Sequence, residues 1–389
     1  MMEKKINSVL LLGIIVVAMN LRSPITSVGP LVGIISENLS LSGGQAGLIT
    51  TIPLMAFAII SPIAPKLANK WTIERTIFGA LMVLIVGMFL RAIPQLFFLF
   101  LGTTLLGAAI AICNVLIPGL VKKEFPDKSG LVTGIYSVSM NLTGAIASGI
   151  SIPLVKKVGF DWNVALGLWS VLALIAFIFW LPQLKRHDKG VTEIKLEENS
   201  SIWASSLAWS VTLFMGIQSF IFYVLVAWMP EMLVDKGLST AQAGGMLSLL
   251  QMTLLPVTFI VPIIAEKRPN QKSFVWVAFL LFASGIVGLM GNNMTITTFS
   301  IMEIGVAGGI AFSLSMMFFN LRTTSAKQAA ELSGMAQSVG YLLAATGPFL
   351  FGFLHDVTNT WKTSLIILLA MTVVLLFVGL NSAKNRVIK

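Results

Sequence analysis

The sequence predicts an all-α polytopic membrane protein with twelve transmembrane helices in two six-helix bundles. Hydrophobic residues make up 56% of the 389 residues and charged residues only 11%, with a mean hydropathy of +0.90. One soluble core cannot bury that much apolar surface. Apolar runs long enough to cross a bilayer also follow one another along the whole chain, and the two halves of the chain share a repeat.

The first half contains six apolar runs, each long enough to span a hydrocarbon layer of about 30 Å. We place them at approximately 8–35, 43–66, 73–92, 95–121, 129–155 and 162–182. The first run follows a basic N-terminus, as in a signal peptide. It continues for about 28 residues and lacks a small-residue cleavage site, so we interpret it as a retained transmembrane helix.

The second half contains six more runs of this kind. We place them at approximately 203–233, 240–265, 273–291, 295–321, 328–355 and 361–381. A polar stretch rich in Lys, Glu and Asp separates the halves. We therefore predict an N-terminal bundle at 1–184, a cytoplasmic central loop at 185–202 and a C-terminal bundle at 203–389.

The two halves resemble each other at a constant offset, which indicates an internal duplication. Leu41–Gly47 matches Leu238–Gly244, and the same offset brings Pro65 onto Pro262. Two six-helix bundles in parallel orientation, with a site at their interface near the midplane, is the arrangement that alternating access requires. Transport is therefore the leading functional hypothesis.

The basic residues predict the orientation of the chain. An even number of spans puts both ends on one side, and the two tails with the alternate loops on that side hold 20 of the 26 Lys and Arg residues. By the positive-inside rule both termini are cytoplasmic, in a multi-pass protein of the cytoplasmic membrane. This topology also explains the net charge of +10, so we expect no nucleic acid partner.

A single arginine, Arg22, interrupts the first apolar run. At about 1.5 Å per helical residue it lies roughly 21 Å above Ser8, well inside a hydrocarbon layer of about 30 Å. Arginine stays protonated there, and a central charge costs at least about 2.5 to 3.5 kcal/mol. We therefore expect Arg22 to line a cavity. The alternative is a structural arginine bonded to carbonyls or to an acid on a neighbouring helix.

The loop after the second run resembles a cytoplasmic motif of the major facilitator superfamily. In Pro65–Arg75, Asn69 replaces the aspartate of that motif and Thr72 replaces its second glycine, whereas the second copy of the loop keeps an acid. The resemblance implies a cytoplasmic gate. The candidate gate residues are Asn69, Lys70, Arg75, Glu266 and Lys267.

Other segments resemble one branch of that superfamily, the cyanate permeases and 2-nitroimidazole transporters. These segments are Asn20–Arg22 with Gly29–Leu31, Asn114–Lys122, Thr133–Tyr136, Trp228–Pro230, Leu332–Gln337 and Gly340–Tyr341 with Gly347–Pro348. The resemblance implies a secondary active transporter that moves a small anionic or electronegative solute, cyanate-like or nitroimidazole-like, across the membrane. Proton coupling and the direction of transport stay open. The alternatives are a multidrug-type efflux proton antiporter and a non-transporting membrane sensor.

The resemblance also implies that the first, fourth, seventh and tenth helices line a central cavity. It therefore places Arg22 and Glu303, on the first and tenth helices, near the transport path. Three hypotheses compete. Arg22 binds the solute while Glu303 carries a proton, or the two residues form an ion pair that breaks during transport, or each residue is structural.

Uncharged polar side chains supply the remaining candidates for solute binding. They are Asn114, Gln218, Tyr223, Tyr136 and Tyr341. The first three lie on helices that face the cavity by resemblance, and the last two recur near glycines and are candidates to stack on a flat solute. Because polar residues also join helices to one another, interhelical hydrogen bonding is the alternative for each.

Nothing in the sequence indicates catalysis, a cofactor or a metal site. Cys113 is the only cysteine, and we find no Cys/His ligand spacing, no phosphate-binding glycine loop and no nucleophile motif. We therefore expect a transporter rather than an enzyme, with no cofactor. We expect a monomer whose partners are a small-molecule solute, the lipid bilayer and, in the proton-coupled alternative, protons.

Overall fold

The computed structural model describes residues 8–41, 43–185 and 202–388. Helices occupy nearly all of this part of the chain, and no strand occurs in it. The central segment 186–201, which was predicted to be a cytoplasmic loop, lies outside the described residues. The predicted all-α fold class is confirmed.

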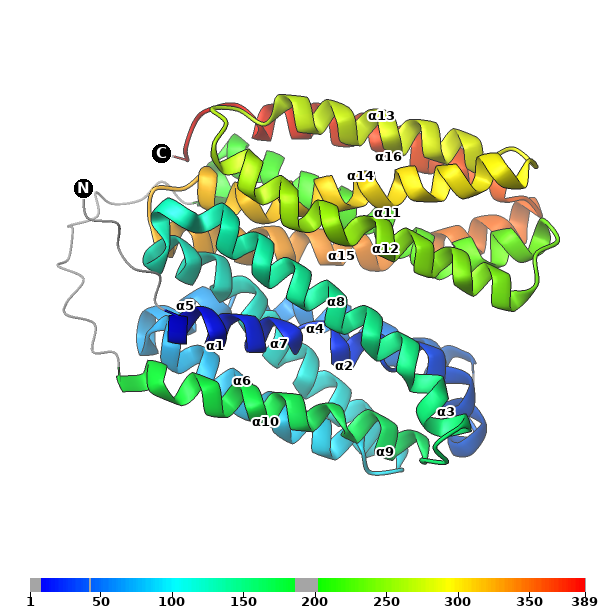
Figure 1. Ribbon diagram of the computed structural model, residues 1–389, viewed down its shortest axis with the longest axis horizontal. Helices are drawn as coiled ribbons and strands as arrows, with labels where there is room; N and C mark the ends of the chain where they lie inside the picture. Colours follow the sequence, from blue (N-terminus) through cyan, green and yellow to red (C-terminus); the bar gives the residue numbers. More distant parts are fainter. Residues whose placement is uncertain (1–7, 42, 186–201, 389) are drawn as a thin grey trace.

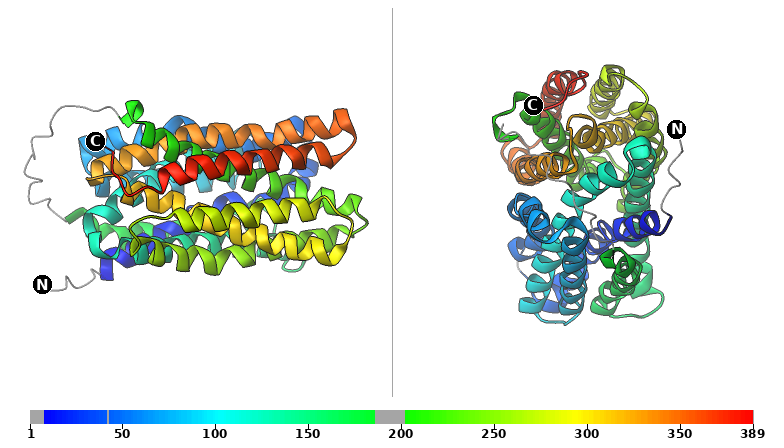
Figure 2. Two further views of the ribbon diagram at one scale, coloured as in Figure 1. Left: turned by 90° about the horizontal axis from the view of Figure 1, so that it is seen from above. Right: turned by 90° about the vertical axis from the view of Figure 1, so that its left-hand side faces the viewer.

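Two groups of helices lie one above the other in Figure 1, and Figure 2 shows the same two groups end-on. The first group consists of α1 (Ser8–Met19), α2 (Ser23–Thr26), η1 (Gly29–Leu31), α3 (Val32–Leu39), α4 (Gly43–Ile60), α5 (Ala64–Trp71), α6 (Ile73–Arg91), α7 (Leu96–Glu124), η2 (Pro126–Lys128), α8 (Ser129–Lys156), α9 (Trp162–Gly167), α10 (Trp169–Trp180) and η3 (Leu181–Lys185). We call it the N-bundle.

The second group, the C-bundle, packs against the N-bundle mainly through α8 on α12 and through α15 on α4 and α7. It consists of η4 (Ile202–Ala204), α11 (Ser206–Asp235), α12 (Thr240–Glu266), α13 (Lys272–Leu289), α14 (Met294–Leu321), α15 (Ala326–Thr358) and α16 (Trp361–Ser382). Helix α1 begins and helix α16 ends at the same end of the bundles, at the left of Figure 1. We call this end the N/C face and the opposite end the far face.

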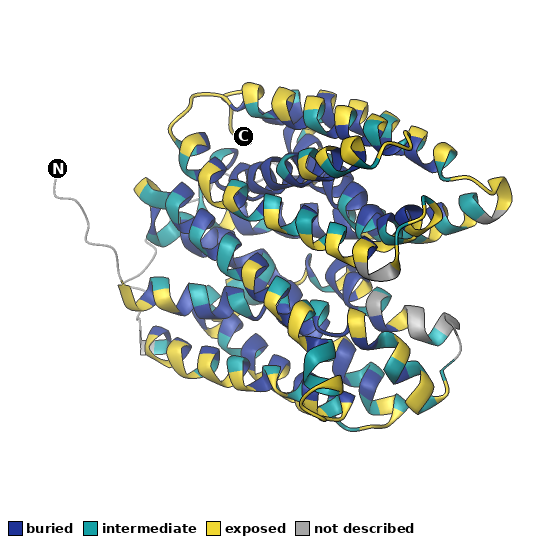
Figure 3. Cartoon of the chain, turned by 45° about the vertical axis from the view of Figure 1, so that its right-hand side comes forward, coloured by how far each residue is buried: buried dark blue, intermediate teal, exposed yellow. Residues whose placement is uncertain are grey.

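The helices are long and apolar enough for the predicted number of spans. Among the described residues, 11 helical stretches could each cross a membrane, and the bent pair Thr51–Ile60 and Ala64–Trp71, with 53° between its halves, provides a twelfth. Exposed residues lie along the outer faces of the bundles in Figure 3. Many exposed residues have large apolar side chains, among them Phe349 at 80% and Phe377 at 67% exposure. These faces suit hydrocarbon rather than water, so the chain is a multi-pass membrane protein.

The two bundles lie close together near the N/C face, where glycines line their interface. A Cβ atom added at Gly130 would lie 2.5 Å from the Pro262 carbonyl oxygen, and one added at Gly334 would lie 2.8 Å from the Ser61 carbonyl oxygen. Any side chain there would push the helices apart. The absence of side chains therefore lets the backbones of the two bundles meet.

The second copy of the sequence repeat, Leu238–Gly244, contains the N-terminus of helix α12. Ser239 caps α12 in a capping box, in which its hydroxyl accepts from the Gln242 backbone N–H and the Gln242 side chain accepts from the Ser239 backbone N–H. The corresponding serine of the first copy, Ser42, lies outside the described residues.

The segment that resembles the superfamily's loop motif is mostly helical. Its first part forms α5, and the chain then turns at Thr72, with φ 77° and ψ 156°, before α6 begins. A β-branched residue rarely adopts a positive φ, whereas glycine adopts it freely. This turn therefore favours glycine, the residue that the superfamily motif has at the position of Thr72, and threonine adopts it under strain. The hydroxyl of Thr72 offsets part of the strain by accepting from the Arg75 backbone N–H.

We expect Thr72→Gly to stabilise the protein by about 1 kcal/mol. It relieves strain of about 1–3 kcal/mol, and a glycine at a helix N-cap costs only a few tenths of a kcal/mol relative to threonine. The measurement is the apparent Tm of the protein in detergent. Ser205→Gly is the control, because Ser205 caps α11 at an unstrained φ of −80°. The control should lower the Tm slightly, and a lower Tm for Thr72→Gly would contradict the strain argument.

Candidate functional site

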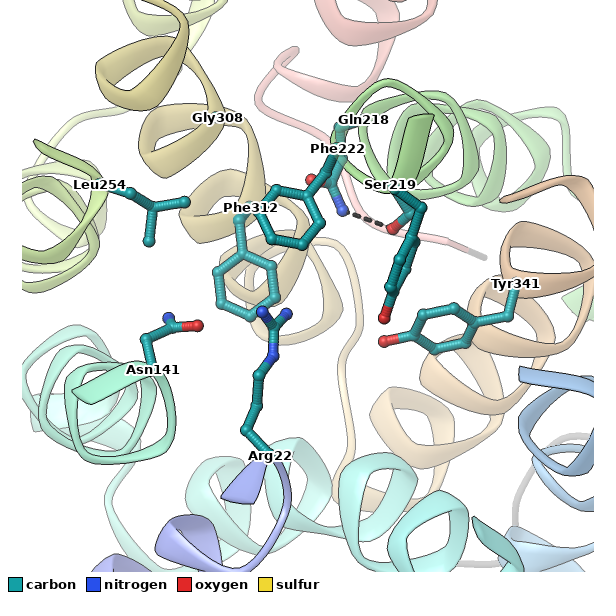
Figure 4. Close-up of a pocket in the computed structure, with 10 residues that line it drawn as sticks. Arg22, Asn141, Gln218, Ser219, Phe222, Leu254, Gly308, Phe312 and Tyr341 are labelled. Carbon is teal, nitrogen blue, oxygen red and sulfur yellow. Dashed lines mark hydrogen bonds between the residues drawn. The ribbon is translucent and has the colours of Figure 1, made fainter. Parts of the chain in front are cut away.

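The first transmembrane span is broken in its middle, and Arg22 sits at the break. Helix α1 ends at Met19, and α2 begins again at Ser23 with Pro24 in its first turn. Proline has no N–H group and fixes its own φ, so it favours a new helix start over a continuous helix. The break turns the Arg22 side chain out of the regular helix surface towards the interface of the two bundles (Figure 4).

Side chains satisfy the backbone carbonyl groups around this break. Asn20 Nδ2 donates to the Val16 carbonyl at 2.8 Å and to the Leu172 carbonyl at 3.2 Å, and Thr26 Oγ1 donates to the Gly144 carbonyl at 2.8 Å. Arg91, which is 1% exposed, donates from Nη1 to the Pro24 carbonyl at 2.6 Å. Irregular backbone at membrane depth requires such partners. The break is therefore a built feature of the N-bundle.

A pocket of about 360 Å³, including the space open to solvent, lies between the bundles at Arg22 (Figure 4). Arg22 and Asn141 come from the N-bundle, and the other lining residues come from the C-bundle. These are Gln218, Ser219, Phe222, Tyr223, Leu254, Gly308, Phe312 and Tyr341. The lining therefore combines one fixed positive charge with amides, hydroxyls and aromatic rings.

Aromatic rings of the C-bundle flank the Arg22 guanidinium. Its Cζ atom lies 5.3 Å from the ring centroid of Phe222 and 5.9 Å from that of Phe312. Both distances fall within the range of cation–π attraction, which gives the charge partial compensation. Within the described part of the chain, the Arg22 side chain makes no hydrogen bond and no ion pair. Its N–H donors are therefore available to a solute.

Two tyrosines close another side of the pocket. The ring centroids of Tyr223 and Tyr341 lie 6.4 Å apart. The Tyr341 ring also packs against Phe57 of the N-bundle, with 4.9 Å between the ring centroids. Gln218 is less available, because its Nε2 donates to Ser219 Oγ at 2.7 Å. The pocket thus offers a guanidinium and two phenol groups among flat apolar faces.

The structure brings four of the predicted solute-binding residues together and leaves two apart. Arg22, Gln218, Tyr223 and Tyr341 line the pocket, whereas Asn114 on α7 and the buried Tyr136 on α8 do not. Sequence reasoning did not select Asn141, Phe222 or Phe312. Asn141 stands two helical turns from Gly134, near the predicted Tyr136, and was the better choice on α8. A phenylalanine in an apolar helix carries no signal that separates it from the core.

Glu303 lies away from Arg22. Its Oε2 accepts from Ser284 Oγ of α13 at 2.8 Å, and it does not line the pocket. Nine residues separate Glu303 from Phe312, which at about 100° per residue puts them on opposite sides of α14. Those nine residues also correspond to about 13.5 Å along the helix axis, so Glu303 differs from the Arg22 level in both height and direction. No Arg22–Glu303 ion pair forms between these described residues in this conformation.

Of the five predicted gate residues, one contacts the other bundle. Glu266 accepts from Ser129 Oγ of α8 at 2.6 Å. The other four are exposed, and the described residues include no side-chain hydrogen bond from them to the other bundle. They are Asn69, Lys70, Arg75 and Lys267.

Two contacts that sequence reasoning missed also join the bundles, one near the N/C face and one between that face and the pocket. Lys122 Nζ of α7 donates to the Thr323 carbonyl at 2.6 Å and to the Asn320 carbonyl, and Ser338 Oγ of α15 donates to the Ala58 carbonyl at 2.5 Å. In each contact one partner is a backbone carbonyl. Sequence patterns do not mark such acceptors, so these contacts become visible only in the fold.

Two helical bundles with a small polar pocket at their shared interface define a membrane transporter that works by alternating access. The sequence matches the Major Facilitator Superfamily over residues 10–348. The chain belongs to that family, and it is therefore a transporter and not an enzyme.

Three curated relatives match over most of their length. An uncharacterised transporter of Bacillus subtilis (strain 168) is 43% identical over 99% of this chain and 96% of its own. A 2-nitroimidazole transporter of Escherichia coli (strain K12) is 38% identical, with 98% of this chain and 97% of its own covered. A cyanate transport protein of the same organism is 23% identical, with 90% of this chain and 91% of its own covered. The predicted branch of the superfamily is confirmed.

Solved structures agree with this fold. The structure of a proton:xylose symporter bound to 6-bromo-6-deoxy-D-glucose matches with a TM-score of 0.80 over 95% of this chain and 94% of its own, at 12% identity. At such low identity the likeness concerns the fold alone.

The Lys122 contact predicts how a single side chain controls the N/C face. Lys122→Met removes two hydrogen bonds from a charged donor, each worth about 1.5–3 kcal/mol, so the bundles should part there at least about tenfold more often. Spin labels at the exposed positions Asp127 and Lys267, with Cys113 replaced by serine, report the distance between the bundles. Lys123→Met is the control, because the ion-pair partner of Lys123, Glu74, belongs to the same bundle. Equal distance distributions in the two variants would contradict this role of Lys122.

Proposed function

We propose that this transporter moves a small, flat, anionic or electronegative solute of the cyanate or nitroimidazole kind, which Arg22 holds by its negative end. The observation that carries the proposal is the Arg22 guanidinium, which two aromatic rings flank at the bundle interface and which has no hydrogen-bond or ion-pair partner in the described part of the chain. A guanidinium binds a small oxyanion, or the negative end of a linear anion, through two parallel N–H donors.

The size and lining of the pocket favour this solute class over a multidrug substrate. Pockets for drug-sized ligands measure about 300–1,000 Å³, and this one, at about 360 Å³ with its open part included, is near the lower limit. Flat aromatic faces beside a cation suit a conjugated anion. The names of the relatives point the same way, since one is a 2-nitroimidazole transporter and another a cyanate transport protein.

We further propose that the N/C face is cytoplasmic, because the loops at this face hold most of the basic residues. The contacts of Glu266, Lys122 and Ser338 then form a cytoplasmic gate. Glu303 stays a candidate proton carrier only if it acts from outside the pocket.

The direct test is transport in proteoliposomes with a panel of cyanate, nitrite, nitrate and 2-nitroimidazole. Arg22→Gln removes a charged donor worth about 1.5–3 kcal/mol, so the KM for a transported member should rise roughly 10- to 150-fold. Lys272→Gln, which changes an exposed charge at the N/C face, should transport like the unaltered protein. Arg22→Gln with an unchanged KM would exclude Arg22 as the binding group. Binding without any transport would favour the sensor alternative.

A second prediction concerns Gly144, which supports Arg22 from α8. A Cβ atom there would lie 3.0 Å from Arg22 Cβ and 3.5 Å from Thr26 Oγ1, so Gly144→Ala should displace Arg22 and raise the KM several-fold. Gly149→Ala is the matched control on the same helix, since nothing lies within 4 Å of its added Cβ. We expect the control to keep the normal KM. The same KM in both variants would show that the position of Arg22 is not critical.

A further inference from the structure

The charge of the pocket is unbalanced. Arg22 is the one charged side chain among the described residues that line it, and the other nine carry amides, hydroxyls, rings or no polar group. The nearest acid in sequence on the lining helix α14 is Glu303, which faces Ser284 of α13 instead. The pocket therefore has a net positive charge whenever it holds no anion.

The walls that close on this charge cannot neutralise it. Phe222, Leu254 and Phe312 of the C-bundle are apolar, and aromatic faces compensate a cation only in part. The amide and hydroxyl oxygens of the lining, including Gln218 Oε1, are acceptors but carry no charge, so they solvate the guanidinium without cancelling its charge. Water that solvates the guanidinium in the open pocket leaves when the bundles close. An isolated ion in such surroundings is strongly disfavoured.

From this imbalance we infer that the protein is an obligate anion exchanger. The inference depends on the proposed function, in which Arg22 binds the transported anion. In alternating access the pocket opens to one side of the membrane, then closes to both sides, and only then opens to the opposite side. With an anion bound, the closed pocket is neutral and the carrier reorients. Without one, closure would bury a bare cation, so the empty carrier stays open to the side on which it released its solute until another anion enters.

The bundle contacts fit this scheme. Arg22 belongs to the N-bundle, whereas the rings over it belong to α11 and α14 of the C-bundle. Any rocking of one bundle on the other therefore changes the surroundings of the charge. A charge placed within one bundle could keep its partners through the motion, but a charge between the bundles cannot. The location of Arg22 thus couples anion occupancy to reorientation.

The test compares exchange with net uptake of ¹⁴C-cyanate in proteoliposomes. One set of vesicles contains unlabelled cyanate and the other contains gluconate, with the membrane potential held at zero by valinomycin and equal potassium. We expect the protein-dependent initial rate to be at least tenfold higher into the cyanate-loaded vesicles. Equal rates into both sets would overturn the exchange inference alone. If no member of the anion panel enters either set, the proposed function falls and the inference falls with it.

Two variants separate the charge of Arg22 from its shape. Arg22→Lys keeps the charge, so the preference for loaded vesicles should persist even if the affinity falls. Arg22→Gln removes the charge, so any remaining uptake should show a ratio near one. A preserved tenfold preference in Arg22→Gln would overturn the inference.

A pair of fluorophores at Asp127 and Lys267, with Cys113 replaced by serine, provides a readout that does not depend on flux. Single-molecule energy transfer between them should show the N/C face opening and closing at least tenfold faster in cyanate than in gluconate. Arg22→Gln should open and close at the same rate in both anions. Equal rates in cyanate and gluconate for the unaltered protein would contradict a reorientation step that requires an anion.

Discussion

The positive charge of Arg22, held at a break in the first transmembrane span and surrounded by rings from the other bundle, is the constraint on which the site depends. A charge at that depth is costly in lipid, and it is tolerated where a cavity admits water or a partner. The pocket is that cavity. Because Arg22 and the rings over it come from different bundles, the charge is also sensitive to the motion by which such carriers work.

The break that presents Arg22 is itself expensive and is supported on several sides. Asn20 donates to the Val16 carbonyl before the break and Thr26 to the Arg22 carbonyl within it. The buried Arg91 donates to the Pro24 carbonyl after it. Unpaired backbone groups within a membrane cost several kcal/mol each, so the polar side chains near the break stabilise the fold while they expose the functional group. Structure and function share the same residues here.

Much of the fold could be predicted from the sequence, because hydrocarbon thickness fixes the length of each span and the repeat relates the halves. Of the site, the sequence identified the depth of Arg22 and three of its polar neighbours. Depth comes from counting residues along one helix. Direction around the helix axis depends on packing against other helices. Glu303 was expected near the pocket, but it faces α13 and lies about 13.5 Å along α14 from Phe312, the residue beside Arg22.

Other parts of the site carry no sequence signal of their own. Phe222 and Phe312 resemble any phenylalanine of a lipid-facing or core helix, and only the fold shows that they flank a guanidinium. The gate contacts of Lys122 and Ser338 end on backbone carbonyls, which every residue possesses. Tyr136 and Tyr341 each lie near glycines on the fifth span of their own bundle, but only Tyr341 lines the pocket. Local resemblance does not determine which face of a helix is used.

The central claim is that Arg22 itself holds the anion, and the location of a bound anion tests it most directly. Selenocyanate is a linear anion whose selenium atom gives an anomalous signal in crystals. The account predicts one strong anomalous peak in the pocket beside the Arg22 guanidinium, between the rings of Phe222 and Phe312, and its loss in Arg22→Gln. A peak elsewhere in the molecule, or one that persists in Arg22→Gln, would contradict the account.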